Sequence, residues 1–235
     1  GRQSAGRRVD RLVHLLQDQG LATDVLTDPA EACGLANQFH SEGNLRALVG
    51  VGGDGTAAEL VNRTQPGVPL TLLAAGTANL LSKRFGLSGD PAQLCRAIAA
   101  GRLFRMDAGR ASGRLFIALV GCGFDADVVQ RVHERRTGHI HLMNYLPPVA
   151  QAVCHYGYPE MRIQWADGDS SETFSARWLI AFNLPCYGGG FRIAPEANGA
   201  DGRLNLCSFR RGRFWSYFLA VLARQHRRLA DSASA

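Results

Sequence analysis

The chain has 235 residues, of which 46% are hydrophobic and 20% are charged. This length fits one large or two modest domains, and either could bury a core without the help of disulfide bonds. Basic residues exceed acidic ones by six, and only one of the 26 basic residues is a lysine, Lys83. Arginine suits phosphates and anionic surfaces, so nucleic acid, an acidic membrane face and a nucleotide all stay open as partners. Genomic base composition explains the arginine excess equally well.

The six cysteines are scattered along the chain without a C-x-x-C pair. We interpret them as small buried side chains of a reducing compartment. The first residues, GRQSAGRR, are too polar for the apolar core of a signal peptide, and no apolar run approaches the roughly 18 residues of a membrane span. We therefore expect a cytoplasmic protein.

The first hundred residues alternate between helical and strand-like patterns, which is typical of an α/β domain with a parallel sheet. Helices are expected where apolar residues recur at helical spacing or follow a capping residue. The continuous apolar run 45–51 is the pattern of a strand buried on both faces. The expected elements are helix 5–20, strand 21–26, helix 29–40 capped by Thr27 or Asp28, strand 45–51, helix 57–63, strand 70–74, helix 79–85 and helix 91–100 capped by Asp90.

Near Gly101 the pattern changes to strand-like stretches joined by glycine, proline and aspartate turns. This change predicts a second, β-rich domain with inserted helices. We place an α/β domain over 1–105 and the β-rich domain over 106–235. The elements expected in the second domain are strand 116–121, a helical region 127–155, strands 161–165, 174–183 and 203–210, and a closing helix 214–229.

A glycine-rich turn, Gly52-Gly53-Asp54-Gly55-Thr56, lies between the strand 45–51 and a helix. Glycines let the backbone bring its N–H groups against a polyphosphate, and the following helix adds the positive end of its dipole. Thr56 can add a hydroxyl hydrogen bond, and Asp54 can organise a metal ion or a metal-bound water. The alternative is a plain turn between strand and helix, in which Asp54 is only a helix cap.

A second turn with glycine and a hydroxyl, Ala75-Gly76-Thr77-Ala78-Asn79, follows the strand 70–74. The pattern G-x-x-x-x-G-K-[ST] is absent around residue 52, because the lone lysine lies elsewhere, so a P-loop NTPase is not supported. In an open parallel sheet, ligands bind beyond the carboxyl ends of the strands. We therefore expect the two turns to form one phosphate cradle.

These two turns resemble those of the diacylglycerol kinase catalytic domain family, which includes bacterial lipid kinases and sphingosine kinases. The resemblance extends through GCGFDA at 121–126, the stretch 136–145, APEA at 194–197 and Asp201-Gly202. It implies an α/β nucleotide-binding domain with a parallel sheet and a C-terminal β-sandwich-like domain, with the lipid headgroup between them. It further implies that ATP is the phosphate donor, with Mg²⁺, and that a lipid hydroxyl is the acceptor.

The resemblance also implies roles for single residues. Asp125 and Asp127 match acidic positions near the lipid hydroxyl, where a carboxylate can accept a hydrogen bond from an alcohol; the alternative for both is a capping or solvated aspartate. The expected catalytic residues are Asp54, Asp125 and Asp127. The expected nucleotide-binding residues are Thr27, Gly52, Gly53, Asp54, Gly55, Thr56, Gly76, Thr77 and Asn79.

The turn 195–203 resembles a magnesium loop found in some bacterial members of the family. The resemblance would place the Asp201 side chain and the backbone carbonyls of Asn198 and Arg203 on the metal, and such oxygen ligands suit magnesium. Asn-Gly and Asp-Gly are also ordinary turn formers, so a metal-free turn explains the same residues at least as well.

The chain departs from the family pattern at both ends. Family members begin with a strand ending in Asn-Pro and continue into an Asp-Gly-Glu motif whose acidic residue is the expected base, and the sequence has neither. We expect a trimmed chain that lacks the first strand and the C-terminal end, with an inactive relative as the alternative. Leu80 and Asn205 stand where relatives often carry acidic residues, which weakens the roles assigned around them.

The apolar run inside 214–229 is flanked by arginines at both ends. It could lie on an anionic bilayer, or it could be a core helix whose arginines extend to solvent. Basic residues are not interleaved with aromatic ones, so nucleic acid is not an expected partner. We predict an ATP-dependent lipid kinase of the cytoplasm, peripheral to the inner face of the membrane. An NAD kinase-like soluble kinase and an inactive nucleotide- or lipid-binding relative are the alternatives, and the oligomeric state, a homodimer included, stays open.

Overall fold

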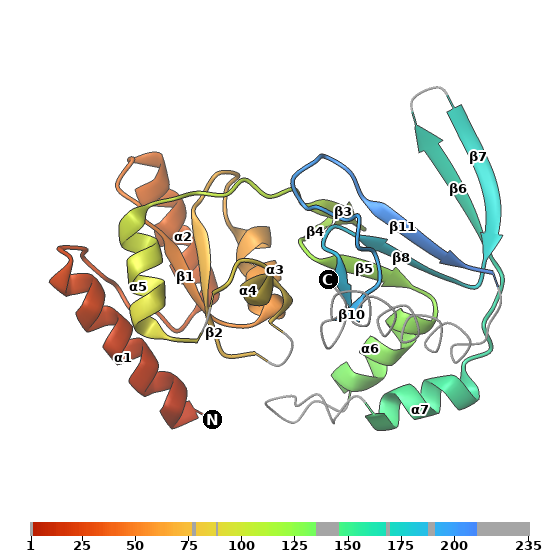
Figure 1. Ribbon diagram of the computed structural model, residues 1–235, viewed down its shortest axis with the longest axis horizontal. Helices are drawn as coiled ribbons and strands as arrows, with labels where there is room; N and C mark the ends of the chain where they lie inside the picture. The colour runs from red at the N-terminus through yellow and green to blue at the C-terminus, as the bar shows by residue number, and fades with distance from the viewer. Residues whose placement is uncertain are drawn as a thin grey trace, which may run out of the picture.

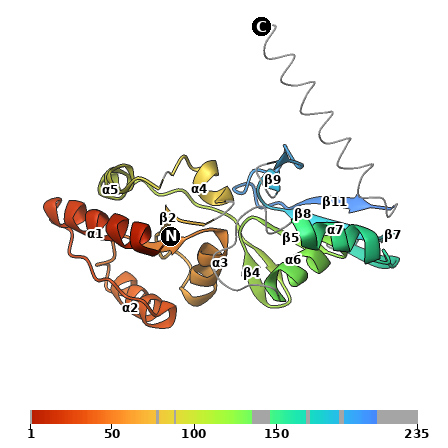
Figure 2. The ribbon, with the colours of Figure 1, turned by 90° about the horizontal axis from the view of Figure 1, so that it is seen from below.

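The N-terminal lobe is built on two parallel strands that end together. The computed structural model describes residues 2–76, 79–87, 89–134, 146–167, 170–187 and 191–210. Within these, β1 (Leu48–Gly52) pairs with β2 (Leu70–Ala74) in a register that sets Gly52 opposite Ala74. Figure 2 shows α2 and α3 on one side of these strands and α4 and α5 on the other. The helices of the lobe are α1 (Arg2–Asp18), α2 (Pro29–Ser41), α3 (Asp54–Arg63), α4 (Leu80–Arg84) and α5 (Pro91–Ala100).

Local capping explains where the helices of this lobe begin and end. The Asp90 side chain accepts from the backbone N–H groups of Ala92 and Gln93, at 3.1 and 3.2 Å, and α5 stops at Gly101, whose φ is 63°. Asp28 caps α2 in the same way, at 2.7 Å from Ala30 N. The bounds predicted for β2 and α5 are confirmed. A core of Leu12, Leu16, Leu73, Leu94, Cys95 and Ile98 joins α1 and α5 to the sheet.

Two predictions about strands of this lobe are wrong. The run 21–26 is not a strand, because no described strand pairs with it, and Val25 is 60% exposed. β1 begins at Leu48 and is not buried on both faces, because Val51 is 42% exposed. Apolar composition alone thus overstated how much of this sheet is covered within the described residues.

Within its described residues, the C-terminal lobe combines an antiparallel sheet with three antiparallel strand pairs and two helices, and Figure 1 shows their arrangement. β8 (Trp178–Phe182) lies between β5 (Leu119–Cys122) and β11 (Asn205–Phe209). The α/β lobe followed by a β-rich lobe with inserted helices confirms the predicted fold class, while the domain boundary near residue 105 stays a prediction. The hairpins are β3 (Gly109–Ala111) with β4 (Arg114–Phe116), β6 (Met161–Asp167) with β7 (Ser170–Ala176), and β9 (Cys186–Tyr187) with β10 (Phe191–Arg192); the helices are α6 (Phe124–Glu134) and α7 (Leu146–His155).

Aromatic packing centres this lobe on Phe124. Its ring stacks on that of Tyr158 at 5.5 Å and meets Trp178 edge-on at 5.3 Å. The predicted single strand 174–183 is wrong, because β7 pairs with β6 whereas β8 pairs with β11. Arg177 separates the two strands, and its N–H donates to Phe209 O at 2.8 Å. The predicted stretches 136–145 and 214–229 lie outside the described residues.

The cysteines are less uniformly buried than predicted. Cys33 and Cys95 are buried, whereas Cys122 and Cys154 are exposed. The exposed pair stands at the end of β5 and near the end of α7, where side chains need not enter the core.

The two lobes share a small core. Ala57, Leu72 and Leu81 of the first lobe pack in one cluster with Leu184 of the second. Beside it, the fully buried Asn183 donates from its side-chain amide to Asp107 O and to Ile117 O, each at 2.7 Å. Since these groups come from both lobes and from the segment between them, the lobes are fixed against each other. None of the described helices is long and apolar enough to cross a bilayer.

Candidate functional site

The two glycine-rich turns touch backbone to backbone. A Cβ at Gly53 would lie 2.9 Å from Gly76 Cα, and a Cβ at Gly76 would lie 2.6 Å from Gly53 Cα. Ala75 N also donates to Gly52 O at 2.9 Å. The predicted proximity of the turns is confirmed, and only glycine at both positions allows it. Their role in nucleotide binding stays a prediction.

Thr56 lies in the first turn of α3, which begins at Asp54 rather than at the predicted residue 57. A Cβ at Gly52 would fall 2.0 Å from Thr56 Oγ1, so the hydroxyl lies against the end of β1. The N-cap residue of α3 is Gly53, and no side chain among the described residues caps this N-terminus. Nothing lies within 4 Å of a Cβ built at Gly55. The first turn of α3 therefore keeps its N–H groups available to an anion.

Asp54 fastens the second turn to the first. Its Oδ2 accepts from Leu80 N at 2.9 Å, and its Oδ1 accepts from Leu81 N at 3.0 Å. The carboxylate thus caps α4, a helix that begins 26 residues further along the chain. The capping alternative therefore describes what Asp54 does in the fold, although the helix it caps is α4 rather than its own. Each oxygen keeps a second lone pair, so the expected magnesium role stays a prediction.

Asn79 closes the second turn on itself. Its Oδ1 accepts from Gly76 N at 3.0 Å, and its Nδ2 donates to Gly76 O at 2.7 Å. Its backbone is left-handed, with φ of 50°, a conformation that asparagine tolerates better than most residues. Thr77 lies outside the described residues. Thr27 lies in the exposed connection before α2, and it makes no hydrogen bond to the described residues of either turn.

Arg8 is a cation near the cradle that the sequence did not single out. It extends from α1, and its Nη1 donates to Ala74 O at the end of β2, at 3.0 Å. Its Nε is buried without a hydrogen-bond partner, and no described carboxylate forms an ion pair with it. A positive charge that no described carboxylate neutralises thus lies next to the second turn. One arginine among many on a helix carries no sequence signal for such a contact.

Asp125 is a buried carboxylate in the first turn of α6, 6% exposed. The Tyr187 hydroxyl donates to its Oδ1. A Cβ at Gly121 would lie 2.1 Å from its Oδ2, so the glycine of this motif makes room for the carboxylate. Burial raises the pKa of Asp125, while the hydrogen bond from Tyr187 opposes that rise. Tyr187 was not predicted, because it lies 62 residues away from Asp125 and matches no motif.

Asp127 has a different environment from Asp125. Arg131 Nε and Nη2 donate to its two carboxylate oxygens at 2.6 and 3.1 Å, which makes a bidentate pair along one face of α6. The two side chains are 32% and 23% exposed, for Arg131 and Asp127 respectively. This arrangement fits the structural alternative for Asp127 better than a catalytic role, which stays a prediction.

The predicted magnesium loop is held by protein groups. Asp201 Oδ1 accepts from Arg203 N at 3.1 Å, the arrangement of an ordinary aspartate turn. Asp107 Oδ2 accepts from Gly202 N at 2.6 Å, and Asp107 N donates to Gly199 O at 2.8 Å. No group of three or more His, Cys, Asp or Glu side chains able to hold a metal occurs in the described part of the chain. The ligand set Asn198, Asp201 and Arg203 stays a prediction.

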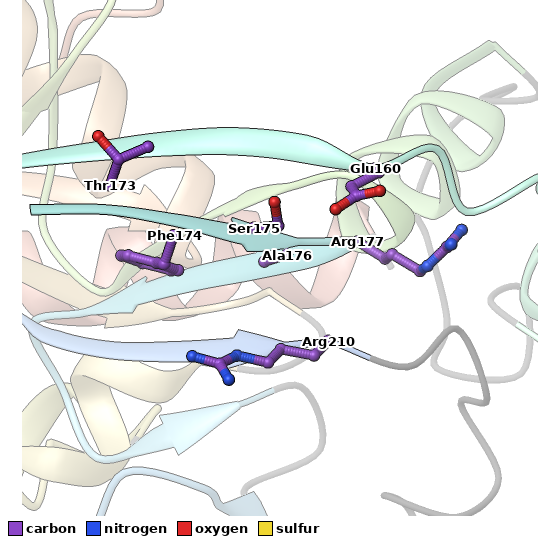
Figure 3. Close-up of a pocket in the computed structure, with 7 residues that line it drawn as sticks. All are labelled: Glu160, Thr173, Phe174, Ser175, Ala176, Arg177 and Arg210. Carbon is purple, nitrogen blue, oxygen red and sulfur yellow. The ribbon is translucent and has the colours of Figure 1, made fainter.

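A separate cavity of 420 Å³ lies on the second lobe, along β7 and the end of β11 (Figure 3). Two arginines and one glutamate give it a polar character, and Arg177 Nη1 donates to Tyr158 O at 2.5 Å. It shares no lining residue with the two turns or with Asp125, so we assign it no part in the chemistry. Its lining residues are Glu160, Thr173, Phe174, Ser175, Ala176, Arg177 and Arg210.

Comparison with known families covers both lobes. Residues 1–111 match the model of the diacylglycerol kinase catalytic domain, and residues 118–222 match that of the YegS C-terminal NAD kinase beta sandwich-like domain.

Similar proteins carry kinase names. One from Chromohalobacter salexigens, named "Probable lipid kinase YegS-like", is 29% identical over 199 residues, which are 79% of this chain and 60% of that protein. A diacylglycerol kinase of Mycobacterium tuberculosis is 27% identical over 169 residues, which are 68% of this chain and 53% of that protein. The chain thus spans a little more than half the length of these curated relatives. The crystal structure of a diacylglycerol kinase from Bacillus anthracis superposes with a TM-score of 0.62 at 17% identity, over 85% of this chain and 67% of that one, and this likeness shows the fold alone.

Proposed function

The chain belongs to the diacylglycerol kinase catalytic domain family, and from this premise we propose that it transfers the γ-phosphate of ATP to the hydroxyl group of a lipid. The observation that carries the proposal is the contact between Gly53 and Gly76, which joins two glycine-rich turns into one cradle at the carboxyl ends of β1 and β2. The acceptor is proposed to be a diacylglycerol-like or sphingoid lipid.

The residues of the cradle fit a triphosphate. The uncapped first turn of α3 offers backbone N–H groups, and the Thr56 hydroxyl lies beside them. Arg8 adds a guanidinium that no described carboxylate neutralises. Magnesium, when bound, neutralises charge on the phosphates, and Asp54 is the residue that would hold it through a water molecule. These groups position the donor and stabilise its charge.

On the acceptor side, Asp125 is proposed to hold the lipid hydroxyl. Tyr187 occupies Oδ1, which leaves Oδ2 to accept a hydrogen bond from the alcohol. The hydroxyl oxygen then forms a bond to the γ-phosphorus, while the bond from that phosphorus to the bridging oxygen of ADP breaks. The acidic residue of the Asp-Gly-Glu motif, which was the expected base, is not in this sequence. We therefore propose that the hydroxyl proton passes to Asp125, whose raised pKa makes it a better proton acceptor than an ordinary aspartate at neutral pH.

A labelling assay tests the transfer. The chain is incubated with γ-labelled ATP and magnesium, with diacylglycerol, sphingoid and glycerolipid acceptors in mixed micelles, and separately with NAD. We expect label in at least one lipid and none in NAD. Label in NAD alone would replace the lipid kinase with a soluble NAD kinase. Calorimetric titration with a non-hydrolysable ATP analogue measures the nucleotide affinity of the cradle separately from phosphate transfer. If the analogue binds but no acceptor is labelled, the function would be limited to nucleotide binding.

A matched pair of variants tests the acceptor side. Asp125→Asn is expected to lower kcat by about a hundredfold or more, the usual contribution of a group that acts on the reacting proton. Asp127→Asn, four residues before its partner Arg131, is expected to lower kcat by less than about fivefold, because it removes a partly exposed ion pair. Equal losses in the two variants would remove Asp125 from the mechanism.

The proposed substrate determines the proposed surroundings. A lipid acceptor places the reaction at a membrane, so we propose that the protein acts peripherally, on the inner face of the cytoplasmic membrane and on anionic lipid, without nucleic acid. A homodimeric state is compatible with this proposal and requires a direct measurement of mass in solution.

A further inference from the structure

Two segments of the first lobe together form an exposed surface that is both apolar and basic. Leu103 is 74% exposed, Phe104 57% and Phe85 36%. The rings of Phe85 and Phe104 lie 5.2 Å apart, so the end of α4 and the segment after α5 form one continuous patch. We call this the basic apolar patch; its residues are Lys83, Arg84, Phe85, Arg102, Leu103, Phe104 and Arg105.

The charge of the patch has a single sign. Lys83, Arg84, Arg102 and Arg105 are all exposed, and the segments 83–87 and 101–105 contain no acidic residue. None of these four cations forms an ion pair with a described carboxylate, in contrast to Arg63, Arg114 and Arg131. The patch therefore presents apolar side chains within an unneutralised positive field.

The patch is close to the proposed nucleotide cradle. The N-cap residue of α4 is Asn79, and its first N–H groups donate to the Asp54 carboxylate; both residues are in the cradle, and α4 ends at Arg84. A helix of five residues is about 8 Å long, so the cradle and the patch are separated by about 8 Å along the axis of α4. The second half of the patch leaves α5 at Gly101 and runs to Met106, which packs in the core shared by the lobes (Figure 1).

We propose that the basic apolar patch docks on an anionic lipid bilayer. Phe85, Leu103 and Phe104 enter the boundary between headgroups and acyl chains, while the four cations contact lipid phosphates. A second copy of the chain fits less well. A two-fold contact would set the four cations against the same four of the partner, and the centres of protein interfaces are depleted of charge.

This inference rests on the proposed function, since a lipid acceptor is what brings the protein to a membrane. Docking is nevertheless measured without turnover, by sedimentation with vesicles of phosphatidylcholine and phosphatidylglycerol, against vesicles of phosphatidylcholine alone. We expect binding to the anionic vesicles only, and it should weaken as salt is added.

Two double variants test the patch. Arg102→Gln with Arg105→Gln is expected to weaken vesicle binding about 25-fold, at about fivefold for each cation removed. Leu103→Gln with Phe104→Gln is expected to weaken it by at least about tenfold. The matched controls are Arg162→Gln with Arg192→Gln, which make the same charge change on exposed residues of β6 and β10, and Val129→Gln on α6. These controls should bind like the unaltered chain.

Equal losses in patch variants and controls, or no binding to anionic vesicles, would overturn the proposal. Light scattering could instead show a dimer that does not bind vesicles and that the double variant Leu103→Gln with Phe104→Gln dissociates. That result would assign the patch to contact with a second copy of the chain. Transfer to acceptors in detergent micelles separates this inference from the proposed function. Vesicle binding that depends on the patch, without phosphate transfer to any lipid, would refute the proposed kinase function but support the proposed docking surface.

Discussion

Replacement of Gly76 by alanine tests whether contact between the two turns makes the cradle. The added Cβ would lie 2.6 Å from Gly53 Cα and 3.0 Å from Gly53 N. Carbon atoms in contact rest at about 3.5–4.0 Å, so the turns must separate by about 1 Å, because the obstructing atoms of Gly53 are backbone; Asn79 Oδ1, 2.7 Å from the added Cβ, must move as well. Overpacking of this kind costs about 1–3 kcal/mol. A shift of about 1 Å in groups that position a substrate can lower the rate about a hundredfold.

Two measurements on Gly76→Ala check this reasoning. Urea denaturation should give a free energy of unfolding about 1–3 kcal/mol lower, and calorimetry should show much weaker binding of an ATP analogue. Gly34→Ala is the control, because nothing lies within 4 Å of a Cβ built at this position of α2. Alanine in a helix should raise the free energy of unfolding by about 0.5–1 kcal/mol, and the affinity for the ATP analogue should not change. A Gly76→Ala protein as stable as the unaltered chain, with unchanged ATP affinity, would refute the cradle geometry.

Three further substitutions test single side chains. Asp54→Ala removes the acceptor of two α4 N–H groups and should cost about 1–2 kcal/mol in urea denaturation, while Asp54→Asn, which keeps one acceptor, should cost less; equal stability of both with the unaltered chain would contradict the capping role. Asp125→Asn should raise the melting temperature at neutral pH, because the raised pKa of Asp125 means that its charged form opposes folding. The cost of the Asp125 charge to folding is absent below the pKa of the unfolded chain, about 4, and it grows as the pH rises through the raised pKa of the folded protein. A gain in melting temperature for Asp125→Asn that persists below pH 4 would therefore contradict this explanation. Asn183→Ala leaves the part-buried carbonyls of Asp107 and Ile117 without their donor and should cost about 2–4 kcal/mol in denaturation, and a loss below about 1 kcal/mol would show that the two bonds do not stabilise the second lobe.

Elements with strong local signals could be predicted from the sequence. The bounds of α5 follow from Asp90 and Pro91 at its start and Gly101 at its end, each of which acts within one turn of helix. The run 21–26 has the composition of a strand but has no partner among the described strands, and pairing is a property of the whole fold. The stretch 174–183 has a continuous strand pattern, yet Arg177 divides it between two sheets.

In the candidate site, too, some features could be predicted from the sequence and others could not. Proximity of the two turns could be predicted, because parallel neighbouring strands bring their carboxyl ends together. The contacts that shape the site could not, since Arg8 reaches Ala74 across 66 residues and Tyr187 reaches Asp125 across 62. Motifs identified the carboxylates, but burial and partners distinguish the buried, raised-pKa Asp125 from an Asp127 already paired with Arg131.

The short helix α4 connects the parts of the molecule that the proposals involve. Five residues are too few for a helix to be stable by its own propensity, so its position depends on what holds it. Asp54 holds its N-terminus in the cradle, and Leu81 packs with Leu184 of the second lobe. Phe85, at its C-terminus, belongs to the basic apolar patch. Because one helix turn carries all three contacts, a membrane that moves Phe85 acts on the same backbone that shapes the cradle. The proposed docking surface and the proposed cradle thus share one short helix.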